Sequence, residues 1–284
     1  MVYNAPLGLH LRLEDSLAQV VTTAQAYNLR SFQLFLVPQG ARAHLMPTPQ
    51  EVEAFVQARR ENFGPLYAHS SYWVNPATSN KRVFLISRSL LKRELALVQA
   101  LEIDFLVLHA GSAKGYRPTS DDPTGKQRAL IALAKMLNNL MKYATNVTIL
   151  LENSAQGKKT IGSDLEDFAE LKNYLNFPEK IGFCLDTAHA FSYGYELDPV
   201  DDFLRIVDRT MGLESVRLIH FNDTHDTCGS MVDQHAFPGK GNIGKDVLTA
   251  LLHHPLLAHA PKIIEGSSTD EQIPLALFRE ISRW

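Results

Sequence analysis

The chain has few cysteines and no long uninterrupted apolar run. Its 284 residues include two cysteines, Cys184 in an expected strand and Cys228 in an expected loop, so a disulfide framework is not expected and a reducing compartment is. No run reaches the roughly 20 apolar residues of a membrane-spanning helix. The first residues also lack the charged and then apolar stretches of a secretory signal. We therefore expect a cytoplasmic protein that does not enter membranes.

The sequence also lacks an excess of charge of one sign. A formal net charge of −3 and a pI near 6.4 argue against a protein that coats nucleic acid generally, although a local basic rim around a cleft stays compatible with them. No proline-rich or low-complexity segment marks a linker between domains. The whole chain, residues 1–284, is therefore expected to form a single domain with a full core.

What the sequence does contain is a regular alternation of strand-like and helix-like segments. Apolar runs of strand length are each followed by a segment with helical spacing of apolar residues, which is typical of a parallel sheet covered by helices. The strand-like runs are residues 6–11, 31–37, 65–69, 104–109, 147–152, 181–186, 215–220 and 261–265. Eight such units, in a chain slightly longer than the ~250 residues of a typical (β/α)₈ barrel, favour a TIM barrel over an open doubly wound sheet.

Metal-binding side chains stand where these runs end. Five histidines and four acidic residues do so: His69, His109, Glu152, Asp186, His189, His220, Asp233, His235 and Glu265. Core strands do not need such endings. In a TIM barrel the carboxyl ends of the strands meet at one face, so these donors are expected to converge although they are far apart in sequence. The connections at about residues 38–48, 110–125, 153–163 and 222–244 follow strands too and are expected to line the same face.

Nine nitrogen and oxygen donors exceed what one ion requires. A catalytic zinc site uses about three protein ligands and leaves one position for water, so the set suits two or three ions that share carboxylates. Neighbouring ions can hold the attacking and leaving oxygens of a displacement at phosphorus, which favours phosphoester hydrolysis. A donor set of histidine and carboxylate without cysteine suits zinc and also manganese.

Longer motifs resemble a known family. The segments IGFCLDTAHAF (181–191) and HFNDTHDTCGSMVDQHAFPGKGNIG (220–244), together with AHSSYWVN, LHAGS, LLENSAQG and IIEGS, resemble the endonuclease IV type of apurinic/apyrimidinic endonuclease. The resemblance extends from about residue 7 to about residue 270 with order and spacing preserved. It implies a TIM barrel with three zinc ions that cleaves the phosphodiester 5′ to an abasic site in double-stranded DNA and leaves a 3′-hydroxyl.

The resemblance also distributes the donors among three ions. It implies a first ion on His69, His109 and Glu152. It implies a second ion on Glu152, Asp186, His220 and Glu265, with Glu152 shared. It implies a third ion on His189, Asp233 and His235. Glu152 and Glu265 are the expected catalytic residues, which would position or deprotonate the attacking water.

Further residues match the family around this set. His10, Asn153, Asn222 and Asp223 are expected to orient the ligands through hydrogen bonds. DNA contacts are expected from Tyr72, which matches a family position, from Trp73 as a wedge beside it, and from Gln39 and Arg42 in the connection after the second strand. Such side chains would exploit the weak stacking of a damaged site.

The connections expected to receive DNA depart from the family pattern. The glycine-rich turn after the first strand is replaced by LRLEDS, which brings Glu14 and Asp15 toward a surface that should face phosphates. Met231 and Gln234 stand where the family usually has basic residues. Each lost cation could remove a phosphate contact. The glycines at 239, 241 and 244 fit either a simple turn or a close approach to phosphate.

Two further functions were weighed. A metal-dependent sugar isomerase or epimerase on the same barrel would act on a small polyol and usually needs fewer ions, so the retained Asp233 and His235 favour the nuclease. A DNA-binding module with a structural metal is disfavoured, because a structural site does not need nine donors. We also expect a monomer that associates with the nucleoid in a prokaryote.

Overall fold

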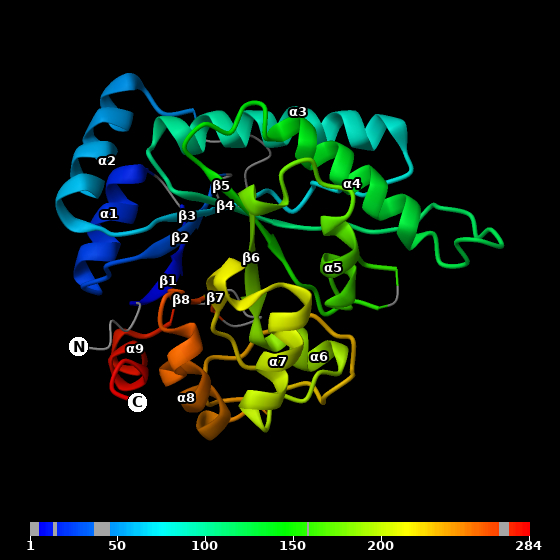
Figure 1. The fold of residues 1–284 in the computed structure, drawn as a ribbon. Coiled ribbons are helices and arrows are strands. Elements are labelled where there is room, and N and C mark those ends of the chain that lie inside the picture. Colours follow the sequence, from blue (N-terminus) through cyan, green and yellow to red (C-terminus); the bar gives the residue numbers. More distant parts are fainter. Residues whose placement is uncertain (1–5, 14–15, 37–45, 158, 267–272) are drawn as a thin grey trace.

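Eight parallel strands close into a barrel, which confirms the expected TIM-barrel fold (Figure 1). The computed structural model describes residues 6–13, 16–36, 46–157, 159–266 and 273–284. Neighbouring strands pair in chain order, and the last strand pairs with the first. The strands are β1 (Leu7–Leu11), β2 (Phe32–Phe35), β3 (Tyr67–His69), β4 (Phe105–His109), β5 (Thr148–Glu152), β6 (Ile181–Asp186), β7 (Val216–His220) and β8 (Lys262–Ile264).

Helices follow the strands and surround the barrel (Figure 1). They are α1 (Leu17–Ala26), α2 (Pro49–Asn62), α3 (Lys81–Ala100), α4 (Lys126–Leu140), α5 (Glu166–Lys172), α6 (Thr187–Tyr193), α7 (Val200–Thr210), α8 (Lys245–His253) and α9 (Leu275–Ile281). Short 3₁₀ segments precede three strands, at Pro178–Lys180, Leu213–Ser215 and Pro255–Leu257. Within the described ranges, no helix combines the length and the apolar character needed to cross a membrane.

Local sequence signals explain where helices begin. At the start of α2, the Thr48 hydroxyl accepts a hydrogen bond from the Glu51 amide, and the Glu51 carboxylate accepts one from the Thr48 amide. The strand expected over IGFCLD, residues 181–186, is confirmed as β6, which ends at Asp186, and the residues that follow it form α6. The Asp186 carboxylate accepts a hydrogen bond from the His189 amide at 2.6 Å and so caps that helix.

The alternation of side chains along the strands creates both the inner core and the position of the donors. Six residues form a separate cluster inside the barrel: Tyr67, Val107, Leu150, Cys184, Leu218 and Ile263. Each lies two residues before one of the strand-end donors. Side chains two apart on a strand share a face. Each donor therefore also points inward, one layer closer to the carboxyl ends of the strands than this apolar cluster. The outward residues pack instead against the helices.

One core position carries an unusual charge. Lys262 is buried at the start of β8, and its ammonium donates a hydrogen bond to the Leu257 carbonyl at 2.6 Å, while no carboxylate of the described residues pairs with it. Burial lowers the pKa of Lys262 to about 8. At neutral pH the folded chain therefore holds a charge that the unfolded chain solvates more favourably.

We expect Lys262→Met to raise the free energy of unfolding at pH 7 by about 1–3 kcal/mol. The Leu257 carbonyl keeps a hydrogen bond from the Ala260 amide, so the substitution leaves no orphaned acceptor there. Between pH 8 and about 10.4 the unfolded chain binds a proton that the folded chain lacks, so wild-type stability rises with pH and the advantage of the variant shrinks. Urea denaturation at pH 7 and pH 10 measures both effects, with the exposed Lys142→Met as control. A destabilised Lys262→Met at pH 7 would contradict the expectation.

Candidate metal centre

The nine predicted donors gather at the carboxyl end of the barrel. His69, His109, Glu152, Asp186 and His220 are the last residues of β3 to β7, and Glu265 directly follows β8. The other three come from the segments after β6 and β7: His189 lies in α6, and Asp233 and His235 lie between β7 and α8. Barrel closure thus brings six strand ends to one place, as parallel topology requires.

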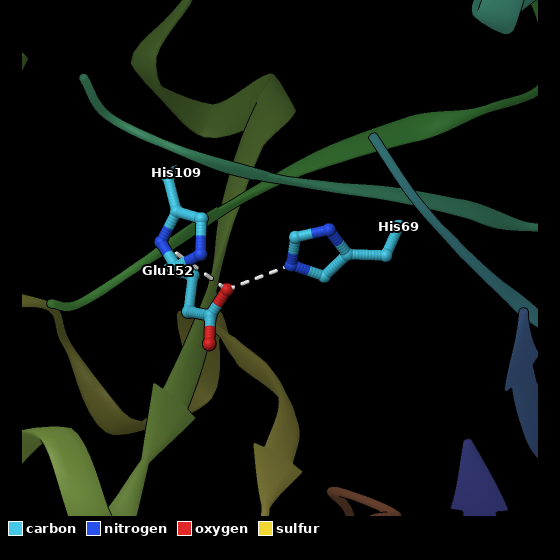
Figure 2. Close-up of side chains that lie close together, drawn as sticks. All are labelled: His69, His109 and Glu152. Carbon is cyan, nitrogen blue, oxygen red and sulfur yellow. Dashed lines mark hydrogen bonds and ion pairs between the residues drawn. The ribbon is translucent and has the colours of Figure 1, made fainter. Parts of the chain in front are cut away.

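The first group joins three neighbouring strands. The Nε2 atom of His69 lies 2.9 Å from Oε2 of Glu152, and Nδ1 of His109 lies 3.5 Å from the same oxygen. Figure 2 shows both imidazole rings directed at this carboxylate from either side. All three ligand atoms lie within 4.8 Å of one another, a separation that one metal ion can bridge.

The second group shares Glu152 with the first. The Nδ1 atom of His220 lies 2.8 Å from Oε1 of Glu152 and 3.3 Å from Oε2 of Glu265. Asp186 completes the group, with its Oδ2 atom 3.8 Å from the same ring nitrogen. Glu152 therefore turns one oxygen to each group, the arrangement expected of a carboxylate shared by two ions.

The third group lies beside the second. The Nε2 atom of His189 is 3.0 Å from Oδ1 of Asp233 and 3.3 Å from Nε2 of His235. Asp186 also approaches this group, since its Oδ2 atom lies 3.7 Å from Nε2 of His235. Asp186 therefore stands between the second and third groups, although the sequence comparison placed it with the second alone.

The hydrogen bonds of three histidines direct a lone pair into the site. The Nδ1–H groups of His69 and His189 donate to the carbonyl oxygens of Ser70 and Asn153, so in the neutral rings the opposite nitrogens carry lone pairs. Those nitrogens face carboxylate oxygens, as Nδ1 of His220 does. A lone pair in contact with a carboxylate requires a cation between them, either a second proton or a metal ion. The donor set fits metal ions on this ground.

The electrostatics of the site lead to the same requirement. Burial alone would raise the pKa of Asp233, but the charges of His189 and His235 lower it to about 2. Burial would likewise raise the pKa of Glu152 and of Glu265, yet neighbouring histidines hold both well below the usual value. Within the described part of the chain, histidines are the only chargeable partners of these carboxylates.

The histidine pKa values respond to the acidic groups around them. Burial would lower the pKa of His189 and of His220, but Asp186 and Asp233 raise that of His189 well above the usual value, and Cys184 followed by Glu265 and Glu152 does so for His220. Glu152 raises the pKa of His69 too. Burial prevails at His109, whose pKa is lowered and whose buried Nδ1 atom has no hydrogen-bond partner. An orphaned ring nitrogen aimed at a carboxylate is a further feature that an ion would satisfy.

The residues expected to orient the ligands have two kinds of hydrogen-bond partner, the ligands themselves or a neighbouring turn. Asn153 and Asn222 contact ligands directly: the amide of Asn153 donates to the Asp186 carbonyl and accepts from its amide, while Asn222 donates to the carboxylates of Asp186 and Glu265. Nδ1 of His10 lies 3.4 Å from Oε1 of Glu265. The contacts of Asn153 and Asn222 are those of side chains that hold ligands in place.

Asp223 has different partners. Its carboxylate accepts hydrogen bonds from the amides of Gly239, Gly241 and Ile243 and so organises the segment that follows the third group. A Cβ atom on Gly241 would lie 2.3 Å from the Thr224 carbonyl oxygen, so this glycine is required by close packing of the turn itself. Asp223 therefore acts on the segment and not on a ligand side chain.

Gln33 is a site residue that the sequence interpretation missed. It lies in β2 with its side chain fully buried, and its amide contacts His10, Glu265 and His220. The signal was a single amide within the apolar run 31–37. In a half-buried strand such a residue is commonly assigned to the polar face, whereas both faces of a barrel strand are buried.

The expected DNA contacts are only partly described. Tyr72 and Trp73 follow His69 closely and form the tip of the turn after β3, with exposed fractions of 82% and 76%. Their rings meet edge to face with centroids 6.5 Å apart. Gln39 and Arg42, like Glu14 and Asp15, lie outside the described residues. Met231, two residues before Asp233 in sequence, is exposed, so an apolar side chain occupies a position where the resemblance predicts a cation.

Known proteins share the sequence pattern and the fold of this chain. Residues 21–284 match the family model described as xylose isomerase-like TIM barrel. The chain is 30% identical to the probable endonuclease 4 of Nitratidesulfovibrio vulgaris, over 97% of this chain and 98% of that protein. It is 30% identical to the probable endonuclease 4 of Halothermothrix orenii, over 95% of this chain and 97% of that protein.

Solved structures show the same relation. The endonuclease IV from Thermus thermophilus superposes with a TM-score of 0.82 at 29% identity and covers 98% of this chain and 99% of its own. A D-tagatose 3-epimerase-like protein reaches a TM-score of 0.70 at 16% identity, over 98% of this chain and 96% of its own. The second likeness concerns the fold alone.

Proposed function

The chain belongs to the endonuclease IV family, within the xylose isomerase-like TIM barrels, and from this membership we propose that it is a DNA-repair endonuclease acting at abasic sites. In the proposed reaction it hydrolyses the phosphodiester 5′ to the abasic site in double-stranded DNA with three metal ions and leaves a 3′-hydroxyl. The observation that supports this most is the sharing of Glu152 between two donor groups, with a third group beside them.

The proposal assigns one metal ion to each group of donors. His69, His109 and Glu152 would hold one ion, Glu152 with Asp186, His220 and Glu265 a second, and His189, Asp233 and His235 a third. Zinc suits these donors, and manganese is the alternative. Bound ions would lower the pKa of the attacking water and neutralise charge on the phosphate and on the departing 3′ oxygen.

The chain's own residues would then orient the reactants. Glu152, which turns an oxygen to each of two groups, is the proposed residue that positions the attacking water and accepts its proton. Glu265, held by Asn222 and Gln33, would assist from the opposite side of the second group. The buried carboxylates would repel the phosphate of the substrate unless cations are present. Metal ions must therefore be bound when the phosphate binds.

The exposed aromatic pair offers a means of recognising the lesion. We propose that Tyr72 and Trp73 enter the duplex at the abasic site, where one base is missing and stacking is weak. Both rings are exposed at the tip of a turn that begins two residues after His69, which supports a location for them at the rim of the centre.

Replacing both rings, Tyr72→Ala with Trp73→Ala, is expected to weaken binding of abasic duplex about 10- to 100-fold, since stacking on an aromatic ring contributes roughly 1–3 kcal/mol per base. Metal content should not change, because neither ring touches a donor. Fluorescence anisotropy with a duplex carrying a tetrahydrofuran abasic analogue measures the affinity. The control is Tyr143→Ala, an exposed ring that follows α4. Unchanged affinity of the double variant would refute the proposal that the two rings enter the duplex.

The sugar isomerase or epimerase hypothesis gains only the fold from the comparisons. An epimerase-like structure shares the barrel at 16% identity, whereas the endonuclease IV structure is 29% identical over the same length. A metal-loaded protein that fails to bind abasic duplex in a gel shift would favour the polyol enzyme. A monomer associated with the nucleoid remains part of the proposal.

A further inference from the structure

The side-chain amide of Gln33 lies next to the second donor group. Gln33 projects from β2 into the barrel, its side chain is fully buried, and three polar groups surround it. Its neighbours in sequence, Phe32 and Leu34, point outward and belong to the apolar layer between strands and helices. A polar side chain at such a depth must have its hydrogen bonds satisfied to be tolerated.

The chemistry of the partners sets the orientation of this amide. Glu265, when ionised, only accepts hydrogen bonds, so the atom 3.0 Å from its Oε1 must be the donor Nε2 of Gln33. The other N–H of that nitrogen donates to Nδ1 of His10 at 2.8 Å. The carbonyl oxygen of Gln33 then faces Nε2 of His220 at 3.0 Å and can only accept from it. Both N–H groups and the carbonyl of the amide are thereby used.

This orientation determines the state of His220. Because Nε2 of His220 carries the hydrogen donated to Gln33, the neutral ring presents its lone pair at Nδ1. Nδ1 is the atom that faces Oε1 of Glu152 at 2.8 Å and Oε2 of Glu265 at 3.3 Å. The same amide holds Oε1 of Glu265, which leaves Oε2 turned toward the second group. One side chain thus orients two ligands of that group at once.

We propose that Gln33 is a positioning residue of the second donor group: its amide holds His220 in the Nε2–H form and directs Oε2 of Glu265 inward, so that both present their lone pairs to one ion. This inference deepens the proposed function and rests on it. Gln33 would not touch the substrate. Its effect would reach the reaction only through the ion that His220 and Glu265 hold with Glu152 and Asp186.

Two substitutions separate this role from simple filling of the barrel. Gln33→Met keeps the volume and length of the side chain and removes every hydrogen bond. Gln33→Glu keeps an acceptor for His220 but places a second carboxylate against Glu265, where Nε2 now donates at 3.0 Å. The matched control is Gln99→Met in α3, whose amide oxygen accepts from the amide and hydroxyl of Thr145 away from the site.

The experiment measures metal binding directly, without reference to incision. Each protein is stripped with chelator and titrated with Co²⁺ against a chromophoric competitor, while the visible spectrum reports the geometry of the bound ions. We expect both Gln33 variants to bind one ion per chain about 10- to 100-fold more weakly, the usual effect of removing a hydrogen bond to a metal ligand. The remaining ions and the Gln99→Met control should match the wild type.

A second readout is the tautomer of His220 in the zinc-loaded protein, from long-range ¹H–¹⁵N correlations. The wild type should show Nε2–H, and Gln33→Met should lose that single form. Wild-type affinity and spectrum in both Gln33 variants would overturn the positioning role and leave the proposed function intact. Equal weakening of all ions together with a lower melting temperature would also overturn it, in favour of a packing role. A wild-type protein that binds no Co²⁺ would remove the proposed function and the role of Gln33 with it.

Discussion

Replacing Glu152 with glutamine is expected to reduce incision at an abasic site by roughly 10²- to 10⁴-fold, the range for loss of a positioned acid–base group. Glutamine fills the same space, but one of its ends is an NH₂ group that cannot accept a hydrogen bond or bind a cation. In the folded chain one oxygen of Glu152 faces Nε2 of His69 and the other faces Nδ1 of His220. Whichever way the amide turns, one donor group loses its oxygen.

The measurement is cleavage of a duplex oligonucleotide with a single tetrahydrofuran abasic analogue, under single-turnover conditions. Elemental analysis of the variant and its circular dichroism establish that it is folded and how many ions it retains. Glu166→Gln, an exposed carboxylate at the start of α5 paired with Arg209, serves as the control and should cut at the wild-type rate. Undiminished cleavage by Glu152→Gln would remove Glu152 from the reaction and, with it, the main support for shared ions.

Complete removal of metal is expected to abolish incision and to destabilise the fold. Four carboxylates converge at the end of the barrel, and in the described residues only histidines oppose them. Ions that bind the folded chain alone stabilise it by about 4 kcal/mol per site when their free concentration is a thousand times Kd. Without ions, protons on His69, His189 and His220 must take over part of the compensation, as their raised pKa values indicate.

The sign of the pH dependence follows from the same histidines. Their pKa values in the metal-free protein are raised by the carboxylates, so protons and ions compete for the same nitrogen lone pairs. Metal affinity is therefore expected to fall as pH decreases through those raised values, and metal binding should release protons. Isothermal titration in two buffers of different ionisation enthalpy measures the release.

Dialysis against chelator followed by incision and thermal melting tests the requirement for metal. Incision and melting temperature should both return on addition of Zn²⁺ or Mn²⁺. Incision at the wild-type rate by a protein shown by elemental analysis to hold no metal would exclude the metal-dependent reaction. A loss of stability that Zn²⁺ restores without restoring incision would instead assign the centre a structural role.

Most of the metal centre could be predicted because its donors are marked locally. His69, His109 and His220 each end a strand-like run in a position that core packing does not explain, and the TIM-barrel prediction already places strand ends together. The motif around Asp233 and His235 added the donors that no strand carries. These features depend on residue type and spacing, which the sequence displays directly.

The errors and omissions arose where the outcome depends on what lies across the barrel. The strand over residues 181–186 was expected, but the short helix α6 that Asp186 caps directly after it was not, because so short an apolar segment does not distinguish a strand from a buried helix. Gln33 was missed because its partners are far away in sequence: His10 lies in β1, His220 ends β7 and Glu265 directly follows β8. Asp223 and Asn222 are neighbours in sequence, yet Asp223 organises a glycine turn whereas Asn222 contacts the proposed ligands.

The sequence by itself determined the barrel and the family and singled out the nine proposed donors, since strand and helix periods and the order of motifs are properties of the chain read in one direction. The resemblance already implied that two groups share Glu152. Only the tertiary structure decided which oxygen of Glu152 faces which group, that Asp186 stands between two groups, and that Gln33 contacts two of the proposed ligands. The reason is geometric. Closing eight strands into a ring fixes distances between side chains far apart in sequence, and the sharing of a carboxylate or the choice of a tautomer depends on those distances.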